Sequence, residues 1–308
     1  MSSKRVHNQR LLYPVKGRLV KMEKIAIITD SCGDVPQIYR EKYDIYVMPI
    51  MIQCGDEEYR DGIDITAQDV YKRQKIDVLK TASPSGKDIV DIFEKVKKNG
   101  YHKAIAILLS GGLSGTSNQV RLFADNQNDI EVAVFDSKSG SIGYGSIAIQ
   151  LAKYRDQGMT FVQLKEQALR LVEDTYVYFS IDTLEFLQKG GRIGKATAFV
   201  GSALKIKPIL SFDKEKGEID VPAKVRGSKK VPAKLIELVE NAKKTNENRA
   251  FYLLVADGAM PEERELLEQQ LKVKYPNYKG CIEAKIGAAL SCYLGPGLLG
   301  AGIQFVDE

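Results

Sequence analysis

The feature of this sequence that most restricts its fold is an alternation of short apolar segments with segments of helical periodicity. The apolar segments have the length of buried strands and comprise Ile25–Thr29, Ile45–Ile52, Ala104–Leu109 and Val132–Phe135. Between them, apolar side chains recur every three or four residues, as at Ile89, Phe93 and Val96. This order predicts right-handed βαβ units around a parallel sheet.

Beyond residue 160 the order of elements changes. Thr160 and Gln163 are typical of a helix start. Strands are expected near Tyr176–Ile181, Ile206–Phe212, Glu218–Val225, Phe251–Asp257, Cys281–Ile286 and Ile303–Val306. The second and third of these flank Lys216-Gly217, which favours a hairpin. Because a chain of 308 residues exceeds the usual limit for one core, we expect a parallel α/β domain at 24–160 and a mixed α/β domain at 161–308.

Residues 1–23 form a separate basic segment. Residues 1–24 contain seven Lys or Arg and one acid, whereas the rest of the chain has almost equal numbers of both charges. The segment has no strand or helix period, and Pro14 and Gly17 interrupt it, so we expect an unpacked extension. Because the body lacks a basic excess, DNA binding is not expected. A basic arm that binds RNA or another anionic surface stays open as an alternative.

Several classes of protein do not fit the sequence. No run of about 18 apolar residues is present for a membrane span, and Leu11–Val15 is too short for the core of a signal peptide. The four cysteines lack a Cys-x-x-Cys spacing, and two histidines are too few for an ordinary zinc site. We therefore expect a cytoplasmic protein without a disulfide framework, bound metal or cofactor.

Three polar loops follow the predicted parallel strands. They are Asp30-Ser31, Ser110–Thr116 and Asp136-Ser137. Ligands of open parallel sheets bind at this edge. The Ser110–Thr116 loop has three glycines, three hydroxyl groups and no charge, and it opens a helix whose free N–H groups favour a carboxylate or phosphate. A turn for tight packing is the alternative. Thr81, Ser83 and Ser85 add hydroxyl groups before another helix start.

Common catalytic motifs are absent. Lys189 and Ala196 stand where a P-loop requires Gly and Ser or Thr, and the loop lacks Gly-x-Gly-x-x-Gly. His102 lies about 20 Å from the loop, across one strand, so a Ser-His pair does not form. Asp30, Asp136 and Asp182 each follow a strand. They leave open a Mg²⁺-dependent enzyme acting on a small phosphorylated or carboxylated metabolite, although capping or turn acids are the simpler interpretation.

A set of motifs resembles one known family. In order along the chain they are Thr29-Asp-Ser31, Thr81-Ala-Ser-Pro84, Leu113-Ser-Gly-Thr116, Phe135-Asp-Ser-Lys138, Asp182-Thr-Leu-Glu-Phe-Leu-Gln-Lys-Gly-Gly-Arg-Ile193, Lys205-Ile-Lys-Pro208 and Gly295-Pro-Gly297. They resemble the DegV family from about residue 24 to the C-terminus. The resemblance implies a two-domain α/β fold with the ligand cleft between the domains.

The same resemblance implies a function. It suggests a fatty-acid-binding carrier subunit of bacterial fatty acid kinase, which buries a long acyl chain and presents the carboxylate to a separate ATP-dependent kinase subunit. The acyl phosphate then enters phospholipid synthesis. Carried over by motif, the carboxylate site falls on Thr81, Ser114, Gly115, Thr116 and Arg226, with Ser83 adding a hydroxyl group beside them.

One position departs from the family pattern. Members of the family with a well-understood carboxylate site carry His two residues before the Gly-Pro-Gly turn, and this chain has Tyr293 there. A tyrosine hydroxyl can donate a hydrogen bond but offers no cation near neutral pH. We expect Tyr293 to donate to the ligand as a neutral group and its ring to pack against the Gly295–Gly297 turn.

Overall fold

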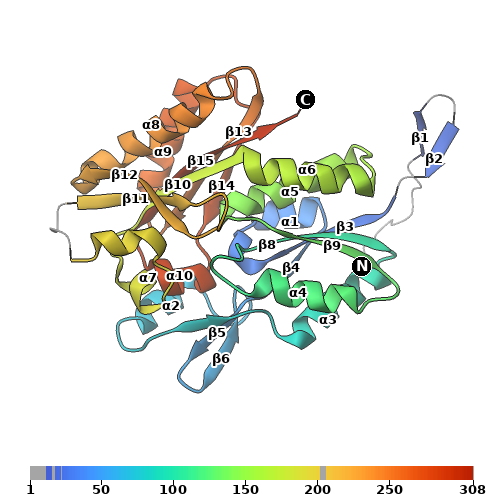
Figure 1. Cartoon of the computed structure of the whole chain (residues 1–308), viewed down its shortest axis with the longest axis horizontal. Helices are drawn as coiled ribbons and strands as arrows, with labels where there is room; N and C mark the ends of the chain where they lie inside the picture. The colour runs from blue at the N-terminus through green and yellow to red at the C-terminus, as the bar shows by residue number, and fades with distance from the viewer. Residues whose placement is uncertain (1–11, 16–17, 22, 202–205, 308) are drawn as a thin grey trace, which may run out of the picture.

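The computed structural model describes residues 12–15, 18–21, 23–201 and 206–307, which build two main sheets and three layers of helices (Figure 1). In this part of the chain, no helix is both long enough and apolar enough to cross a bilayer. The four cysteines are free thiols.

The first sheet confirms the predicted parallel arrangement. Its order is β4-β3-β8-β9, and every neighbouring pair is parallel. The strands are β3 (Ile25–Asp30), β4 (Ile45–Met48), β8 (Lys103–Leu108) and β9 (Glu131–Asp136). Every residue of β3 is buried, as expected where helices cover both faces of a sheet.

Alternate side chains of this sheet enter two different cores. Ala26 and Ile28 pack with residues of α3 (Gly86–Lys98) and α4 (Thr116–Asp125). Ile25 and Ile27 pack with residues of α5 (Ile142–Asp156) and α6 (Phe161–Asp174). Successive residues of a strand point to opposite faces, so the two helix pairs cover opposite faces of the sheet.

Local signals that the sequence predicts are present at the helix starts. The Ser85 hydroxyl accepts a hydrogen bond from the Asp88 amide at 3.0 Å and begins α3. Thr160 and Gln163 form a complete capping box at the start of α6. The predicted helical face of α3, Ile89, Phe93 and Val96, is buried.

The second sheet is mixed and has the order β12-β11-β10-β15-β13-β14. Only the β13–β14 pair is parallel. The strands are β10 (Thr175–Ser180), β11 (Ile206–Phe212), β12 (Ile219–Arg226), β13 (Ala250–Gly258), β14 (Gly280–Lys285) and β15 (Leu298–Val306). The last strand was expected near Ile303–Val306 and begins five residues earlier, so it spans the centre of the sheet.

Helices α5 and α6 form a shared middle layer. They lie between the two sheets, while α8 (Val231–Lys244) and α9 (Pro261–Lys274) cover the outer face of the second sheet (Figure 1). Twelve of the 15 residues of α5 are buried, as expected for a helix enclosed on all sides. The two helices on either side of the predicted boundary at residue 160 therefore belong to one layer.

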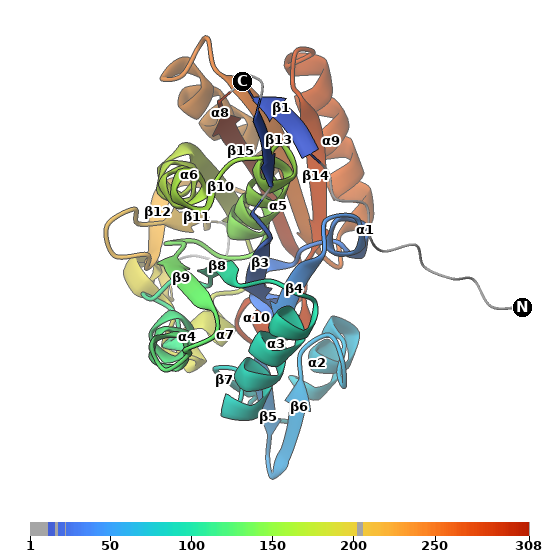
Figure 2. The ribbon, with the colours of Figure 1, turned by 90° about the vertical axis from the view of Figure 1, so that its right-hand side faces the viewer.

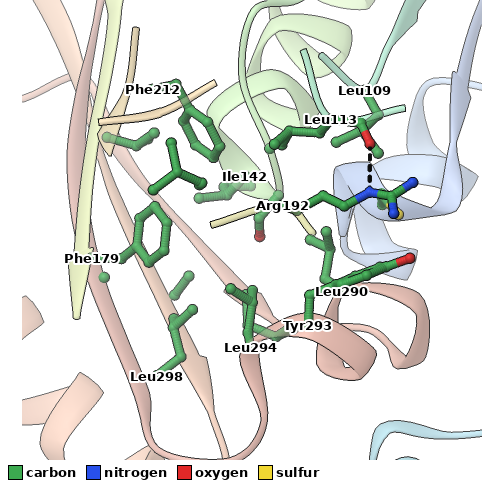
Figure 3. A pocket seen from close by; sticks show the side chains of 18 of the residues that line it. Leu109, Leu113, Ile142, Phe179, Arg192, Phe212, Leu290, Tyr293, Leu294 and Leu298 are labelled. Atoms are coloured by element: carbon green, nitrogen blue, oxygen red, sulfur yellow. Dashed lines mark hydrogen bonds between the residues drawn. The ribbon is translucent and has the colours of Figure 1, made fainter. Parts of the chain in front are cut away.

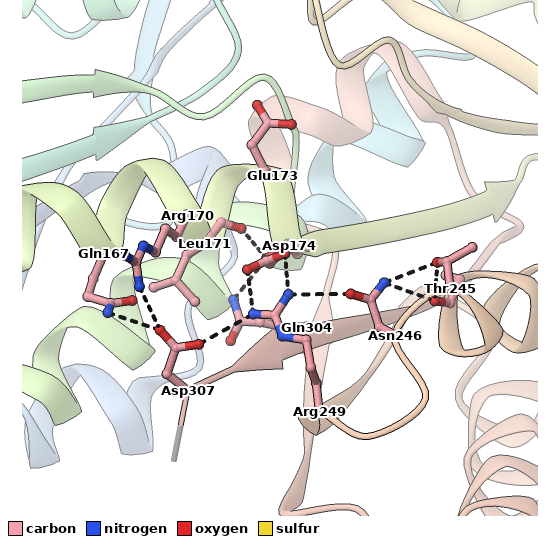
Figure 4. Close-up of polar contacts among 12 residues, drawn as sticks. Gln167, Arg170, Leu171, Glu173, Asp174, Thr245, Asn246, Arg249, Gln304 and Asp307 are labelled. Atoms are coloured by element: carbon pink, nitrogen blue, oxygen red, sulfur yellow. Dashed lines mark hydrogen bonds and ion pairs between the residues drawn. The ribbon is translucent and has the colours of Figure 1, made fainter.

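A polar network fastens α6 to the second sheet (Figure 4). Arg249 donates from both Nη atoms to the two Asp174 carboxylate oxygens, each at 2.6 Å. Asp307, near the C-terminus, accepts from Gln167 at 3.1 Å and Arg170 at 3.2 Å. The bidentate pair joins the end of α6 to the residue before β13.

A small third sheet extends from the body at the lower edge of Figure 2. Its order is β6-β5-β7, with β5 (Met51–Cys54), β6 (Glu57–Arg60) and β7 (Lys80–Ala82). The prediction of one strand over Ile45–Ile52 is wrong, because β4 ends before Pro49 and β5 belongs to this sheet. Pro49 has no N–H to donate to a ladder, which interrupts pairing.

The remaining elements are short. They are α1 (Gln37–Lys42), α2 (Ala67–Arg73), α7 (Glu185–Lys189), α10 (Ala288–Leu294) and the 3₁₀ turns Ser31–Gly33, Gly194–Phe199 and Ser228–Lys230. The sequence analysis did not predict α10.

Part of the basic N-terminal segment forms strands, although the sequence shows no strand period there and Pro14 was expected to interrupt any element; the unpacked extension at 1–23 stays a prediction. β1 (Leu12–Val15) pairs antiparallel with β2 (Arg18–Lys21). Both strands of a two-stranded ribbon are edges, where proline is tolerated, so Pro14 does not prevent pairing. The basic residues Lys4, Arg5, Arg10 and Lys16 lie outside the described residues.

Candidate functional site

A pocket lies where the loops after the parallel strands face the inner side of the second sheet (Figure 3). Cys32, Ser114 and Ser141 come from the loops after β3, β8 and β9, and all three line the pocket. The predicted convergence of these loops is therefore present. The apolar wall includes Leu109, Leu113, Ile142, Phe179, Phe212, Leu290, Leu294 and Leu298.

The pocket is narrow. The space free of atoms, including the opening to solvent, is about 900 Å³, and only a small part of it is wide enough to hold a water molecule. A thin apolar molecule suits such a space better than a broad polar one.

Polar side chains gather at one end of this pocket. Thr81, Ser114, Arg192 and Tyr293 all line it, and we call this end the polar mouth. In Figure 3, Arg192 and Tyr293 lie on one side of the pocket and Phe179 and Phe212 on the other. The pocket thus has a polar end and an apolar end.

Thr81 and Tyr293 are joined directly at the mouth. Their hydroxyl groups share a hydrogen bond of 2.8 Å, and the Thr81 amide donates to the Tyr293 hydroxyl at 3.3 Å. Thr81 lies on β7 and Tyr293 on α10, 212 residues apart in sequence. The structure therefore brings together two residues that were predicted to belong to one site.

A chain of three hydroxyl groups borders the mouth. Ser114 and Thr116 share a hydrogen bond of 2.8 Å, and the Thr116 hydroxyl donates to Ser83 at 3.3 Å. Ser114 and Ser83 are half-buried and Thr116 is buried. Gly115 precedes α4 as its N-cap, and the Ser114 hydroxyl accepts a hydrogen bond from the Thr116 amide at 3.3 Å. Hydroxyl groups can reverse donor and acceptor roles, so this chain can turn a donor toward a bound anion.

The cation at the mouth is Arg192, and Arg226 is not among the residues that line the pocket. The Arg192 Nε donates to the Leu113 carbonyl at 3.2 Å, and its guanidinium lies 5.4 Å from the centre of the Tyr293 ring. Ile219, at the start of β12, lines the pocket, whereas exposed Arg226 ends the same strand. Seven residues of extended strand separate them by about 23 Å.

The ring of Tyr293 lies against Gly190, where a Cβ atom would come within 2.3 Å of the ring, while Phe186 occupies the space beside Gly295. Packing of the ring against the Gly295–Gly297 turn stays a prediction. Glycine at 190 lets the ring lie flat between α7 and the Arg192 guanidinium.

Two carboxylates hold the helix that carries Tyr293. The Gly287 amide donates to Asp34 at 2.9 Å and the Ala288 amide donates to Asp61 at 3.0 Å. The Ser141 hydroxyl, from the pocket wall, donates to the other Asp34 oxygen at 2.5 Å. Burial raises the pKa of Asp61 and raises that of Asp34 well above its usual range. These bonds fix α10 beside the loops of the first sheet.

The three acids considered as Mg²⁺ ligands are each bound to protein groups. Asp30 accepts from the Leu109 amide at 2.8 Å and the Tyr144 hydroxyl at 2.6 Å. Asp136 accepts from the Gly111 amide at 3.0 Å, and Asp182 pairs with Lys207 at 3.4 Å. Within the described ranges, no three His, Cys, Asp or Glu side chains are grouped to hold a metal ion. Their contacts fit turn and capping roles.

Sequence reasoning missed Arg192, Asp34 and Asp61. Arg192 stands in the Asp182–Ile193 motif, which contributed to the family resemblance but was not assigned to the site. Asp34 and Asp61 carry no local signal, because their partners lie 253 and 227 residues away.

Fold and site together define an α/β protein of two sheets that encloses a narrow apolar pocket with a polar mouth. A family model described as "Uncharacterised protein, DegV family COG1307" matches residues 24–306. The chain belongs to the DegV family. A DegV domain-containing protein of Clostridium acetobutylicum is 36% identical over 285 residues, which cover 91% of this chain and 98% of that protein.

Solved structures of the family have the same fold. A fatty-acid-binding DegV protein of Bacillus subtilis is 29% identical, with a TM-score of 0.82 over 92% of this chain and 100% of that one. A DegV family protein of Thermus thermophilus, described by its fatty acid binding, is 26% identical, with a TM-score of 0.84 over 92% of this chain and 99% of that one. The predicted family and fold are confirmed.

Proposed function

We propose that this protein binds a long-chain fatty acid, with the apolar tail inside the pocket and the carboxylate at the polar mouth. The observation that carries the proposal is the division of one narrow pocket into an apolar interior and a polar end. Each buried methylene contributes about 0.8 kcal/mol, so a long tail supplies the affinity. The fatty-acid-binding relatives from B. subtilis and T. thermophilus support the same ligand class.

The mouth offers the donors that a carboxylate needs. An ionised group that leaves water requires several hydrogen bonds or a cation to offset lost hydration. The hydroxyl groups of Thr81, Ser114 and Tyr293 can supply hydrogen bonds, and Arg192 supplies a positive charge. In this proposal Thr116 and Ser83 orient the Ser114 hydroxyl from behind. Arg226 remains a prediction that rests on the family motif alone.

We further propose that the protein is a carrier and not itself a kinase. The exposed side chain of Arg192 places the mouth at the surface, where a second protein can reach the carboxylate. The sequence lacks a P-loop for ATP. A separate ATP-dependent fatty acid kinase subunit would then form the acyl phosphate on the presented carboxylate.

Reconstitution tests the carrier role. With palmitic acid, ATP and Mg²⁺, this protein alone is expected to form no acyl phosphate, and addition of a bacterial fatty acid kinase catalytic subunit is expected to start its formation. Product can be measured by mass spectrometry. Turnover by this protein alone would show that it is an enzyme. No product with a kinase subunit that works with another carrier would reject the partnership.

A further inference from the structure

Gly300 lines the pocket from the second sheet. It is the third residue of β15, paired with Phe179 of β10 on one side and Ala256 of β13 on the other, and all three residues line the pocket. Leu298, two residues earlier and therefore on the same face, also lines the pocket in Figure 3. The missing side chain at Gly300 leaves a gap in a row of side chains that face the cavity.

The backbone does not require glycine at this position. A Cβ atom added to Gly300 would lie 3.4 Å from the Phe179 Cβ, 3.5 Å from the Tyr178 oxygen and 3.7 Å from the Ala256 oxygen, which are ordinary contacts. Gly300 is also not one of the described glycines that have a positive φ. Glycine inside a strand also weakens the strand relative to alanine, so stability does not explain it.

At Gly302, two residues later, the structure does require glycine. A Cβ atom there would lie 2.4 Å from the Tyr176 carbonyl oxygen and 2.8 Å from the Val177 Cγ1. The neighbouring strand therefore excludes a side chain at Gly302. At Gly300, by contrast, no atom of the described residues comes closer than 3.4 Å to the corresponding Cβ position.

The gap lies at the apolar end of the pocket. Phe179 and Leu298, which flank Gly300 on the sheet, lie across the pocket from Arg192 and Tyr293 (Figure 3). A molecule held by its polar group at the mouth would place the end of its tail over Gly300. Phe179 and Phe212, whose ring centres are 5.7 Å apart, border the same region.

We propose that Gly300 determines the longest apolar tail that the pocket accepts. This inference rests on the proposed fatty acid binding and adds the residue that selects among chain lengths. A side chain at position 300 would fill the space of the last methylenes and leave the mouth unchanged. Each methylene excluded from apolar contact is expected to weaken binding about fourfold.

Calorimetric titration with decanoic acid and stearic acid tests the proposal on the full chain. Gly300→Val is expected to weaken stearic acid binding by about 15-fold or more, equivalent to two excluded methylenes, and to leave decanoic acid binding within about twofold. Gly300→Ala should give a smaller loss in the same direction. Gly280→Ala, in the same sheet but outside the pocket, is the matched control and should change neither affinity.

The outcomes separate the two claims. Loss confined to stearic acid supports the role of Gly300. Equal loss for both acids, or no loss in a folded Gly300→Ala or Gly300→Val variant, rejects it while fatty acid binding stands. Failure of the wild-type protein to bind either acid rejects the proposed function, and the inference with it.

Discussion

At the scale of single residues, the polar mouth depends on the hydroxyl group of Tyr293. The Tyr293 hydroxyl is hydrogen-bonded to Thr81 at 2.8 Å, which links α10 to β7. Both residues also line the pocket. A hydroxyl group can donate a hydrogen bond to a carboxylate, whereas a histidine at this position would add a group that titrates near neutral pH. This predicts a binding site whose affinity varies little with pH in that range.

Tyr293→Phe separates the hydroxyl from the ring. We expect it to weaken binding of palmitic acid by about 1 kcal/mol, since one donor to a charged group is lost, and to leave binding of the methyl ester almost unchanged. Titrations at pH 6 and pH 8 should give similar affinities for the wild-type protein, whereas Tyr293→His should introduce a pH dependence. Equal losses for acid and ester would assign Tyr293 to packing alone.

The two candidate arginines can be compared directly. Arg192→Ala is expected to weaken palmitic acid binding by about 1 kcal/mol or more, because it removes the cation that lines the mouth. Arg226→Ala, a matched change about 23 Å along the strand from the pocket, should have no effect. Fluorescent fatty acid displacement measures both. An effect of Arg226→Ala alone would favour the family motif over the geometry.

At the scale of elements, buried carboxylates join strands and helices around the pocket. Asp30, at the end of β3, accepts from the Leu109 amide after β8 and from the Tyr144 hydroxyl on α5. Burial is the main cause that raises its pKa to about 6, and the hydrogen bonds oppose that rise. The three elements therefore meet at one titratable group.

Asp30 makes the free energy of unfolding depend on pH. Its folded pKa of about 6 exceeds the ordinary unfolded value near 3.9, so its stabilising contribution is full below about pH 4 and is lost as the pH rises through 6. The loss is about 3 kcal/mol. Urea unfolding at pH 4.5 and 7.5 should show a smaller change for Asp30→Asn than for the wild-type protein. Equal changes in the two proteins would contradict this assignment.

The elements also explain which site residues could be predicted from local sequence patterns and which could not. Ser114 could be predicted because a buried strand ending in a glycine-rich loop places it at the sheet edge. Tyr293 could be placed only through family resemblance, because α10 is held by Asp34 and Asp61 across more than 200 residues. Arg226 was assigned through the family motif, and where the end of β12 lies relative to the pocket depends on sheet packing that local sequence patterns do not encode.

At the scale of the whole molecule, two sheets share the helical layer α5–α6 and enclose the pocket together. The loops of the parallel sheet supply Ser114 at the mouth, while β10 and β15 of the mixed sheet supply Phe179 and Gly300 at the apolar end. Because both sheets contribute residues to the pocket lining, a bound fatty acid would contact both. Ligand binding is therefore expected to stabilise the whole chain against unfolding.

Native mass spectrometry of the protein, expressed in bacteria and purified without added ligand, tests the central claim most directly. A narrow apolar pocket that binds long acyl chains should retain them from the cell, so the account predicts an added mass equal to one fatty acid per chain. Organic extraction should release a free acid and not an ester. A protein that carries no acyl mass, and takes up none from palmitic or stearic acid, would contradict the assignment of this pocket to fatty acids.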